Sequence, residues 1–306
     1  MSIAVLFPGQ GAQSPGFLHR LPDHPAVAAT LVEATAVLGR EILELDQDAA
    51  LQSTVAVQLG LLVAGVAVAR ALAAEGVVPA MVAGLSVGSF AAAVTAGAVG
   101  FADALRLVDR RARLMEQACP AGHGMVAVTG LPQRRVEAIV AAAGPPLYLA
   151  NLNGPAEFVL SGADPALDRA IDAAQQAGAR RAERLAVAVP SHCPLMDDAA
   201  AALAAAVESA PVTAPRILMV GNRRARMLRD AAAVREELAT NLAHPVRWSD
   251  SVALMAEHGA AAFLEMPPGT VLTRLAAAEF PDLPGRCMES LSLPGARAFA
   301  ARSGGR

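Results

Sequence analysis

The chain has 306 residues, with 25 Lys and Arg against 28 Asp and Glu, giving a formal net charge of −3. The basic residues are scattered along the chain rather than gathered in one run, which excludes nucleic-acid binding. The length allows a substantial core in one large domain or two smaller ones, so an enzyme with its own cleft is possible.

Hydrophobic residues make up 54% of the chain, and residues 53–74 are long enough to span a membrane. This segment contains Gln58 and Arg70 and lacks flanking basic anchors, so we interpret it as a buried helix of a large domain. Residues 1–7 are too short for a signal peptide and lack a basic start. We therefore predict a cytoplasmic protein with no membrane partner.

The three cysteines, Cys119, Cys193 and Cys287, are odd in number and show no CxxC spacing. Neither a disulfide framework nor a zinc site is indicated. We predict no metal and no bound cofactor, and reduced thiols agree with a cytoplasmic location.

From the N-terminus, short apolar runs are followed by glycine turns and alanine-rich helices, which is typical of an α/β sheet covered by helices. Residues 3–7 and 78–83 read as strands, and a helix is expected at 89–96. Later in the chain we expect helices at 194–210 and 231–242 and strands at 217–220 and 262–265.

Between these parts the pattern changes to strand, helix, two strands, helix and strand, at 125–130, 132–144, 147–153, 157–162, 165–178 and 179–189. This βαββαβ order matches the ferredoxin-like split βαβ unit. We therefore expect a small ferredoxin-like subdomain, residues 124–189, inserted into a large α/β subdomain formed by residues 1–123 and 190–306.

Residues 84–88, Gly-Leu-Ser-Val-Gly, form a GxSxG motif between a predicted strand and a predicted helix. Such a turn exposes the serine hydroxyl at the edge of the sheet, and the flanking glycines give it steric room. The N-terminus of the following helix, with the Val87 N–H, would stabilise an oxyanion formed there. A glycine-flanked serine can also be a tight βα turn without chemistry.

A serine nucleophile needs a base, and residues 190–193, Pro-Ser-His-Cys, supply His192 just after the predicted insertion. We interpret the remaining histidines as structural residues: His19, His24, His123, His244 and His258.

Residues 7–13, Phe-Pro-Gly-Gln-Gly-Ala-Gln, resemble the FPGQGxQ opening of malonyl-CoA:acyl-carrier-protein transacylases. Four further segments resemble motifs of that family in the same order, namely its GHSxG elbow, R-G-x-x-M helix, N-x-N-x-P segment and V-P-S-H loop: residues 84–88, 110–115, 151–155 and 189–192. The resemblance covers nearly the whole chain and implies an α/β-hydrolase-like large subdomain with a parallel sheet and a ferredoxin-like insertion.

By position, the resemblance implies that Ser86 is the acyl-accepting nucleophile and His192 its base. The backbone N–H groups of Gln10 and Val87 would form the oxyanion hole. Asn241 falls where the family commonly has a glutamine that orients the histidine, which implies a changed but polar contact.

The resemblance also implies that Arg111 pairs with the malonyl carboxylate. A guanidinium offers two parallel donors to a carboxylate and would leave an acetyl group without this contact. The alternative for an arginine in this helix is a solvated side chain, which suits Arg113 better.

Two residues depart from the usual GHSLGE elbow, because Leu85 replaces its histidine and Ser89 its acid. This elbow and residues 220–226 resemble the malonyl-transferring subunit of bacterial malonate decarboxylase, whose acceptor is a carrier protein with a dephospho-CoA-derived group. Arg223, Arg224 and Arg226 either contact phosphates or an acidic carrier surface or form a solvated loop.

We expect a ping-pong transfer of malonyl from malonyl-CoA to the phosphopantetheine-type thiol of an acyl carrier protein, with malonate decarboxylase as the expected system and its other subunits as further partners. The closest alternative is the malonyl transacylase of fatty-acid or polyketide synthesis. A serine hydrolase or thioesterase would use the same serine and histidine with water. A non-catalytic assembly subunit agrees poorly with the presence of Ser86, His192 and Arg111.

Overall fold

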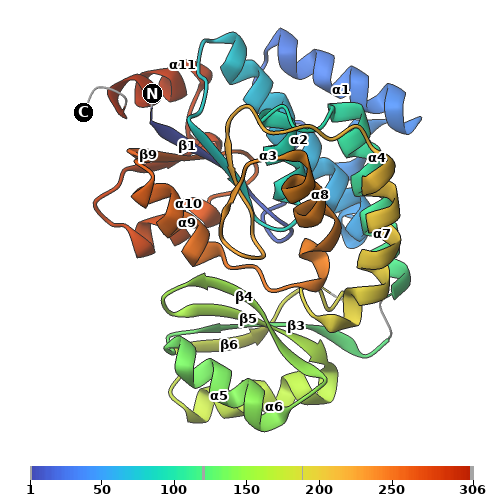
Figure 1. Cartoon of the computed structure of the whole chain (residues 1–306), viewed down its shortest axis with the longest axis vertical. Helices are drawn as coiled ribbons and strands as arrows, with labels where there is room; N and C mark the ends of the chain where they lie inside the picture. The colour runs from blue at the N-terminus through green and yellow to red at the C-terminus, as the bar shows by residue number, and fades with distance from the viewer. Residues whose placement is uncertain (1, 119–120, 188, 304–306) are drawn as a thin grey trace.

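The computed structural model describes residues 2–118, 121–187 and 189–303. A six-stranded sheet with the order β10-β9-β1-β2-β7-β8 lies at the centre of the larger part of the molecule (Figure 1). Neighbouring strands are parallel except for the antiparallel pair of β7 and β8. The strands are β1 (Ile3–Phe7), β2 (Met81–Gly84), β7 (Leu218–Val220), β8 (Met227–Leu228), β9 (Ala262–Glu265) and β10 (Gly285–Cys287).

Helices cover both faces of this sheet. Side chains of β1 alternate between two cores, since Ile3, Val5 and Phe7 belong to one and Ala4 and Leu6 to the other. The first core is shared with α1 (Pro25–Leu38), α2 (Thr54–Ala74), α3 (Gly88–Thr95), α4 (Phe101–Ala118), α7 (Asp197–Ser209), α8 (Ala231–Thr240) and α11 (Leu293–Ser303). The second is shared with α9 (Trp248–Glu257) and α10 (Val271–Glu279).

The apolar helix α2 is long and apolar enough to cross a membrane by length and composition, but 89% of its most apolar window is buried inside the molecule. It packs against α1, α3 and α4. This arrangement confirms the prediction of a buried core helix.

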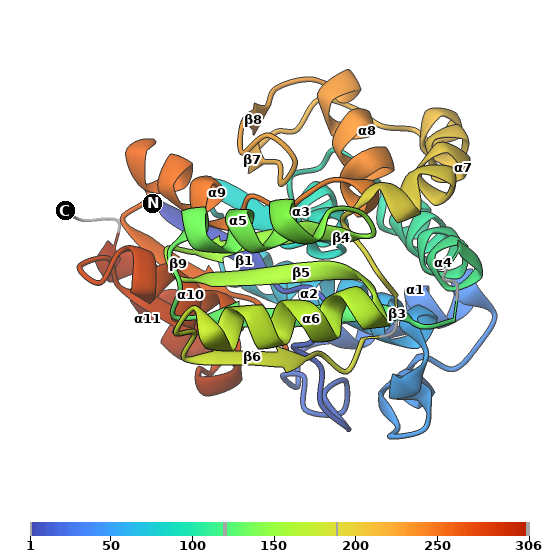
Figure 2. The ribbon, with the colours of Figure 1, turned by 90° about the horizontal axis from the view of Figure 1, so that it is seen from below.

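A second sheet has the order β4-β5-β3-β6, and all its strand pairs are antiparallel. Two helices lie on its face away from the large sheet (Figures 1 and 2). The elements are β3 (His123–Thr129), α5 (Gln133–Ala143), β4 (Leu147–Gly154), β5 (Glu157–Ala163), α6 (Asp164–Gln176) and β6 (Arg181–Arg184). The ferredoxin-like topology is therefore confirmed, whereas the predicted subdomain boundaries stay a prediction.

Several contacts join this small sheet to the larger part, and two of them involve segments close to α9 and α10. Val246 forms a parallel bridge with Asn151 of β4, and the Val246 N–H donates to the Ala150 carbonyl over 2.9 Å. Arg274 of α10 makes a two-pronged ion pair with Glu157 of β5, at 2.7 and 3.0 Å. The small sheet is thus held against the segments that flank α9 and α10.

Four predicted elements differ from the structure by more than two residues or in the type of helix. Strand β2 begins at Met81 rather than at residue 78, because Pro79 has no N–H for a strand ladder and Val78 is 57% exposed. Strand β6 ends at Arg184, although the prediction extended to 189, and residue 188 lies outside the described residues. The helices expected at 194–210 and 231–242 are divided into 3₁₀ turns and α-helices, with turns at Pro194–Met196 and Asn241–Ala243.

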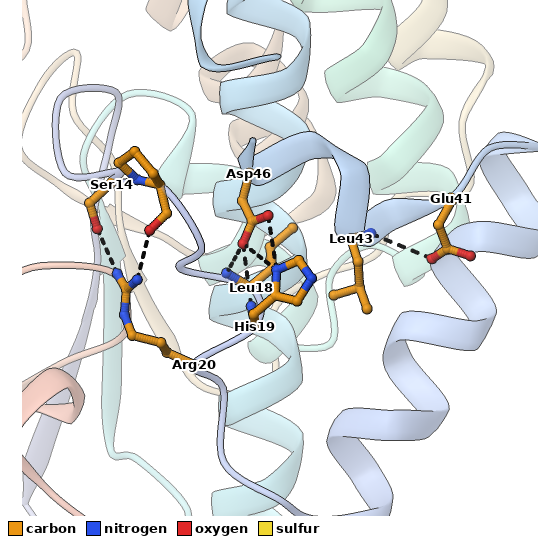
Figure 3. A network of polar contacts seen from close by, with 8 residues as sticks. Ser14, Leu18, His19, Arg20, Glu41, Leu43 and Asp46 are labelled. Carbon is orange, nitrogen blue, oxygen red and sulfur yellow. Dashed lines mark hydrogen bonds and ion pairs between the residues drawn. The ribbon is translucent and has the colours of Figure 1, made fainter. Parts of the chain in front are cut away.

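The loop after β1 is held by the buried carboxylate of Asp46 (Figure 3). This carboxylate accepts hydrogen bonds from the backbone N–H groups of Leu18, at 2.7 Å, and His19, at 3.3 Å. The His19 ring and Asp46 are 3.0 Å apart, and Arg20 donates to the Ser14 hydroxyl. These contacts fix the far end of the loop that begins with residues 8–11.

We predict that Phe158→Ala lowers the free energy of unfolding by about 3–5 kcal/mol, because the side chain is 1% exposed in the core of the small sheet. Val32→Ala is the control, since Val32 is 70% exposed, and its effect should stay within about 0.5 kcal/mol. Urea unfolding followed by circular dichroism measures both variants. Equal stabilities would contradict the packing described for the small sheet.

Candidate active site

The GxSxG motif forms a tight elbow between β2 and α3. Ser86 has φ of 55°, in the left-handed region that few residues other than glycine adopt. A Cβ atom on Gly84 would lie 1.9 Å from the carbonyl carbon of Gly88, and one on Gly88 would lie 2.3 Å from the Phe7 carbonyl oxygen. Both glycines are therefore required by close backbone approach.

Ser86 and His192 are brought together from positions 106 residues apart, with Ser86 Oγ and His192 Nε2 separated by 2.9 Å. On the other side of the ring, His192 Nδ1 lies 2.7 Å from the Asn241 carbonyl oxygen and 3.2 Å from that of His244. Because carbonyl oxygens only accept, Nδ1 carries the ring proton. The lone pair of Nε2 then faces the serine hydroxyl, which is the arrangement of a general base.

The surroundings of His192 keep its ring neutral. Burial, and then the positive charge of Arg111, lower the pKa of His192 from 6.5 to about 4. The two carbonyl contacts at Nδ1 oppose this shift but are outweighed. At neutral pH the imidazole is therefore able to accept a proton.

Arg111 lies on α4 and is fully buried, and it points at the same hydroxyl. Its Nη2 donates to Ser86 Oγ over 3.1 Å and its Nη1 to Gln58 Oε1 over 2.6 Å. No carboxylate of the described residues pairs with it, and its Nε has no hydrogen-bond partner there. Burial lowers the pKa of Arg111 to about 9. A buried cation without a counter-ion is costly, and a bound anion would relieve that cost.

Arg113 is a direct comparison on the same helix. Its side chain is 55% exposed and its guanidinium pairs with Asp109 at 2.8 Å. This agrees with the interpretation of Arg113 as a solvated helix arginine, and it shows that the environment of Arg111 is not a general property of α4.

The loop after β1 lies directly against the elbow. A Cβ atom on Gly9 would lie 2.7 Å from the Leu85 carbonyl oxygen, and the Leu85 N–H donates to the Phe7 carbonyl over 2.9 Å. Within the described part of the chain, the backbone N–H groups of Gln10 and Val87 donate no hydrogen bond to the protein. Both amides stay available to another acceptor.

The contacts of Asn241 differ from the side-chain contact with His192 that the family resemblance implies. Its backbone carbonyl, not its side chain, accepts from His192. The side-chain amide instead donates to the Ser86 carbonyl oxygen over 3.2 Å. Asn241 thus touches both Ser86 and His192.

Two residues that the sequence analysis did not assign to the site also belong to it. Gln58 holds the Arg111 guanidinium, and its signal was the one amide within a largely apolar helix. Asn222 accepts the Ser86 N–H over 2.7 Å, and it belongs to residues 220–226, which we interpreted only through a family resemblance and their arginines. Those arginines share one carboxylate, since Arg223, Arg224 and Arg226 all pair with Glu236.

The rings of the other histidines bond elsewhere, as with the His24 ring, which accepts the Ala26 N–H at the start of α1. Cys193 and Cys287 are free buried thiols, and Cys119 lies outside the described residues. Across residues 2–118, 121–187 and 189–303, no three His, Cys, Asp or Glu side chains are grouped to hold a metal ion.

A serine on a strand-to-helix elbow of an α/β sheet, hydrogen-bonded to a neutral histidine, defines a nucleophile-elbow protein. The acyl transferase domain family is matched over residues 5–297, and the chain belongs to this family of acyltransferases.

Named relatives agree with this assignment. The chain is 40% identical over 280 residues to the malonyl CoA-acyl carrier protein transacylase of Salmonella typhimurium, with 89% of this chain and 91% of the relative covered. The solved structure of the transacylase of that name from Coxiella burnetii superposes with a TM-score of 0.94 at 33% identity, covering 99% of this chain and 98% of that one. A malonyl-transacylase solved with its type II PKS acyl-carrier protein has a TM-score of 0.91 and 36% identity, covering 95% and 97%.

We predict that the His192 ring stays neutral down to about pH 5, as followed by NMR of its imidazole carbons, because its pKa is near 4. Replacing Arg111 by Met should raise the titration midpoint of the His192 ring, because the positive charge that lowers it is lost. The midpoint should stay below 6.5, because the ring remains buried. The pKa of His192 is lower in the folded chain than in the unfolded chain. Its contribution to the free energy of unfolding is therefore fully present above about pH 6.5 and is lost as the pH falls toward 4. A wild-type midpoint near 6.5 would contradict this account.

Proposed function

We propose that this acyltransferase moves a malonyl group from malonyl-CoA to the thiol of an acyl carrier protein through a malonyl ester on Ser86. The observation that carries the proposal is the buried guanidinium of Arg111, which lacks a carboxylate partner among the described residues and lies 3.1 Å from Ser86 Oγ. An acyl group with its own carboxylate supplies the missing anion at the point where the serine reacts.

In the first half-reaction, His192 Nε2 takes the Ser86 proton while Oγ attacks the thioester carbonyl of malonyl-CoA. The tetrahedral oxyanion is stabilised by the free N–H groups of Gln10 and Val87. When the C–S bond breaks, the proton on His192 passes to the CoA sulfur and the malonyl ester of Ser86 remains.

The second half-reaction repeats these steps with a different nucleophile. His192 takes the proton of the carrier thiol, whose sulfur attacks the ester carbonyl, and the same two amides stabilise the oxyanion. Collapse breaks the bond to Oγ, and His192 returns the proton to Ser86. One base and one pair of amides thus serve both directions of a ping-pong cycle.

Arg111 supplies the acyl selectivity. Its Nη2 now donates to the serine hydroxyl, and a malonyl carboxylate would replace that weak acceptor with a charged one held by two parallel bonds. Gln58 Oε1 accepts from Nη1 and thereby restrains the guanidinium group. An acetyl group would leave the buried cation uncompensated, so we infer a preference for malonyl.

For the acceptor, the support comes from the relatives, which are named as malonyl CoA-acyl carrier protein transacylases. One solved relative holds a type II PKS acyl-carrier protein. We therefore infer a carrier of fatty-acid or polyketide synthesis with a phosphopantetheine-type thiol, in the cytoplasm.

A narrower proposal is the carrier of malonate decarboxylase with its dephospho-CoA-derived group. It is supported by the resemblance of residues 220–226 and of the elbow, where Leu85 packs against Gly9 and the Ser89 hydroxyl donates to the Gly84 carbonyl over 3.0 Å. The other subunits of that system would be partners only under this narrower proposal. Arg111 argues against a general esterase with water as acceptor, because an acyl group without a carboxylate would leave the buried guanidinium without an anion.

We predict that brief incubation with malonyl-CoA adds one malonyl group to the wild-type chain in intact-mass spectra. Ser86→Ala should show no adduct, because the accepting hydroxyl is gone. The matched control is Ser89→Ala, which removes a buried serine of the same elbow and should leave the adduct in place. An adduct on Ser86→Ala, or none on the wild type, would refute the ester mechanism.

We further predict that the malonyl-enzyme is discharged faster by a carrier with 4′-phosphopantetheine than by a malonate decarboxylase carrier. Purified carriers of the two kinds, added to the isolated malonyl-enzyme, separate the two acceptors by the rate of adduct loss. Faster discharge by the decarboxylase carrier would favour the narrower proposal. Loss of the adduct to water at an equal rate would favour a hydrolase.

A further inference from the structure

One buried amide spans the serine elbow. Asn222 follows β7, the neighbour of β2 in the sheet, and its side chain is 0% exposed. Its Oδ1 accepts the Ser86 N–H and its Nδ2 donates to the Gly84 carbonyl, both over 2.7 Å. A single planar group therefore fixes the backbone on both sides of Leu85.

The backbone of Ser86 needs such a restraint. Its φ of 55° is unfavourable for a residue with a Cβ atom and persists only where the surroundings hold it. The Ser86 N–H, which donates to Asn222, takes no part in a ladder of the sheet. Release of this N–H would let the elbow relax and move Oγ away from His192.

The backbone of Asn222 is in turn held by Glu237 of α8. Glu237 is only 4% exposed. Glu237 Oε1 accepts the Asn222 N–H over 2.7 Å, and Oε2 accepts the Arg223 N–H over 3.4 Å. A Cβ atom on Gly221 would lie 2.7 Å from Glu237 Oε2, so the preceding glycine makes room for this carboxylate. Neither Asn222 nor Glu237 has a hydrogen bond to Ser86 Oγ within the described chain.

We propose that Asn222, held by Glu237, is the positioning residue that sets the Ser86 elbow for acylation. It acts through the Ser86 N–H and the Gly84 carbonyl, which keep Oγ at His192 Nε2 and the following Val87 N–H toward the oxyanion. This inference rests on the proposed role of Ser86 as the acyl-accepting nucleophile.

Ser89 offers a matched control for a merely structural role. Its hydroxyl also donates to the Gly84 carbonyl, over 3.0 Å, and its side chain is 0% exposed. Ser89→Ala therefore removes a buried hydrogen bond to the same carbonyl but leaves the Ser86 N–H bound to Asn222.

The test measures single-turnover acylation by malonyl-CoA in rapid-quench mass spectra, with urea stability in parallel. Asn222→Ala should lower the maximal rate about a hundredfold and leave the half-saturating malonyl-CoA concentration within about threefold of wild type. Ser89→Ala should keep the rate within about threefold despite its own loss of stability. An Asn222→Ala rate equal to that of Ser89→Ala would overturn the inference.

Two conservative variants keep the test decisive if Asn222→Ala does not fold. Asn222→Asp keeps an acceptor for the Ser86 N–H but places an oxygen, in place of the Nδ2 donor, toward the Gly84 carbonyl. Glu237→Gln keeps only one of the two carboxylate oxygens that accept from the backbone N–H groups of Asn222 and Arg223. Each should slow acylation at least about tenfold, and wild-type rates in both would overturn the inference.

The rate of Ser86 labelling by a fluorophosphonate, which needs no malonyl group, gives the same comparison independently. A wild-type chain that is labelled but not malonylated would refute the proposed function alone. Equal labelling rates in wild type and Asn222→Ala would refute the positioning role.

Discussion

The buried positive charge of Arg111 is the interaction on which the chemistry of this site depends. Taking a guanidinium out of water without an anion is unfavourable, and among the described residues only Gln58 and the Ser86 hydroxyl accept hydrogen bonds from it. Burial and, second to it, the same positive charge lower the pKa of His192, so the base is neutral before substrate binds. The charge of Arg111 therefore serves the selectivity for a charged acyl group and also helps to keep the base neutral.

The fold explains how this charge and the serine meet. Parallel strands direct the loops after β1 and β2 to one edge of the sheet, and α2 and α4 pack side by side over one face. Gln58 comes from α2 and Arg111 from α4, so helix packing sets the guanidinium without a loop. Rigid elements of this kind hold a site more tightly than loops do.

The elbow itself depends on backbone contacts too close for side chains. Gly84, Gly88 and Gly9 each face backbone carbonyls at distances that a Cβ atom would violate. Because these glycines have no side chains, the loop after β1 packs directly against the turn that carries Ser86. The two predicted oxyanion donors, one on each segment, are brought to the same region by that packing.

Much of this arrangement was predictable from local signals. The apolar runs of β1 and β9 were placed without error because buried parallel strands read as continuous hydrophobic runs. The short edge strands β8 and β10 were missed, since two or three residues carry no periodicity. The βαββαβ order of the insertion was regular enough to identify its topology.

The site was predictable only in part. Ser86, His192 and Arg111 were found through motifs and family resemblance, which could not show that their side chains meet. The contact of the Asn241 carbonyl with His192 cannot be predicted from the amino-acid type at position 241, because every residue has a backbone carbonyl. Gln58 and Asn222 lie 53 and 136 residues from their partners, and tertiary packing alone connects them.

The most direct test is the ratio of kcat/KM for malonyl-CoA to that for acetyl-CoA, measured as acylation of the wild type, Arg111→Met and Arg113→Met. We expect the wild type to favour malonyl-CoA strongly and Arg111→Met to lower the ratio by at least about tenfold, because a buried charge-assisted bond is lost. Arg113→Met, with its exposed ion pair removed, should keep the wild-type ratio. A ratio that is unchanged in Arg111→Met would contradict the central claim.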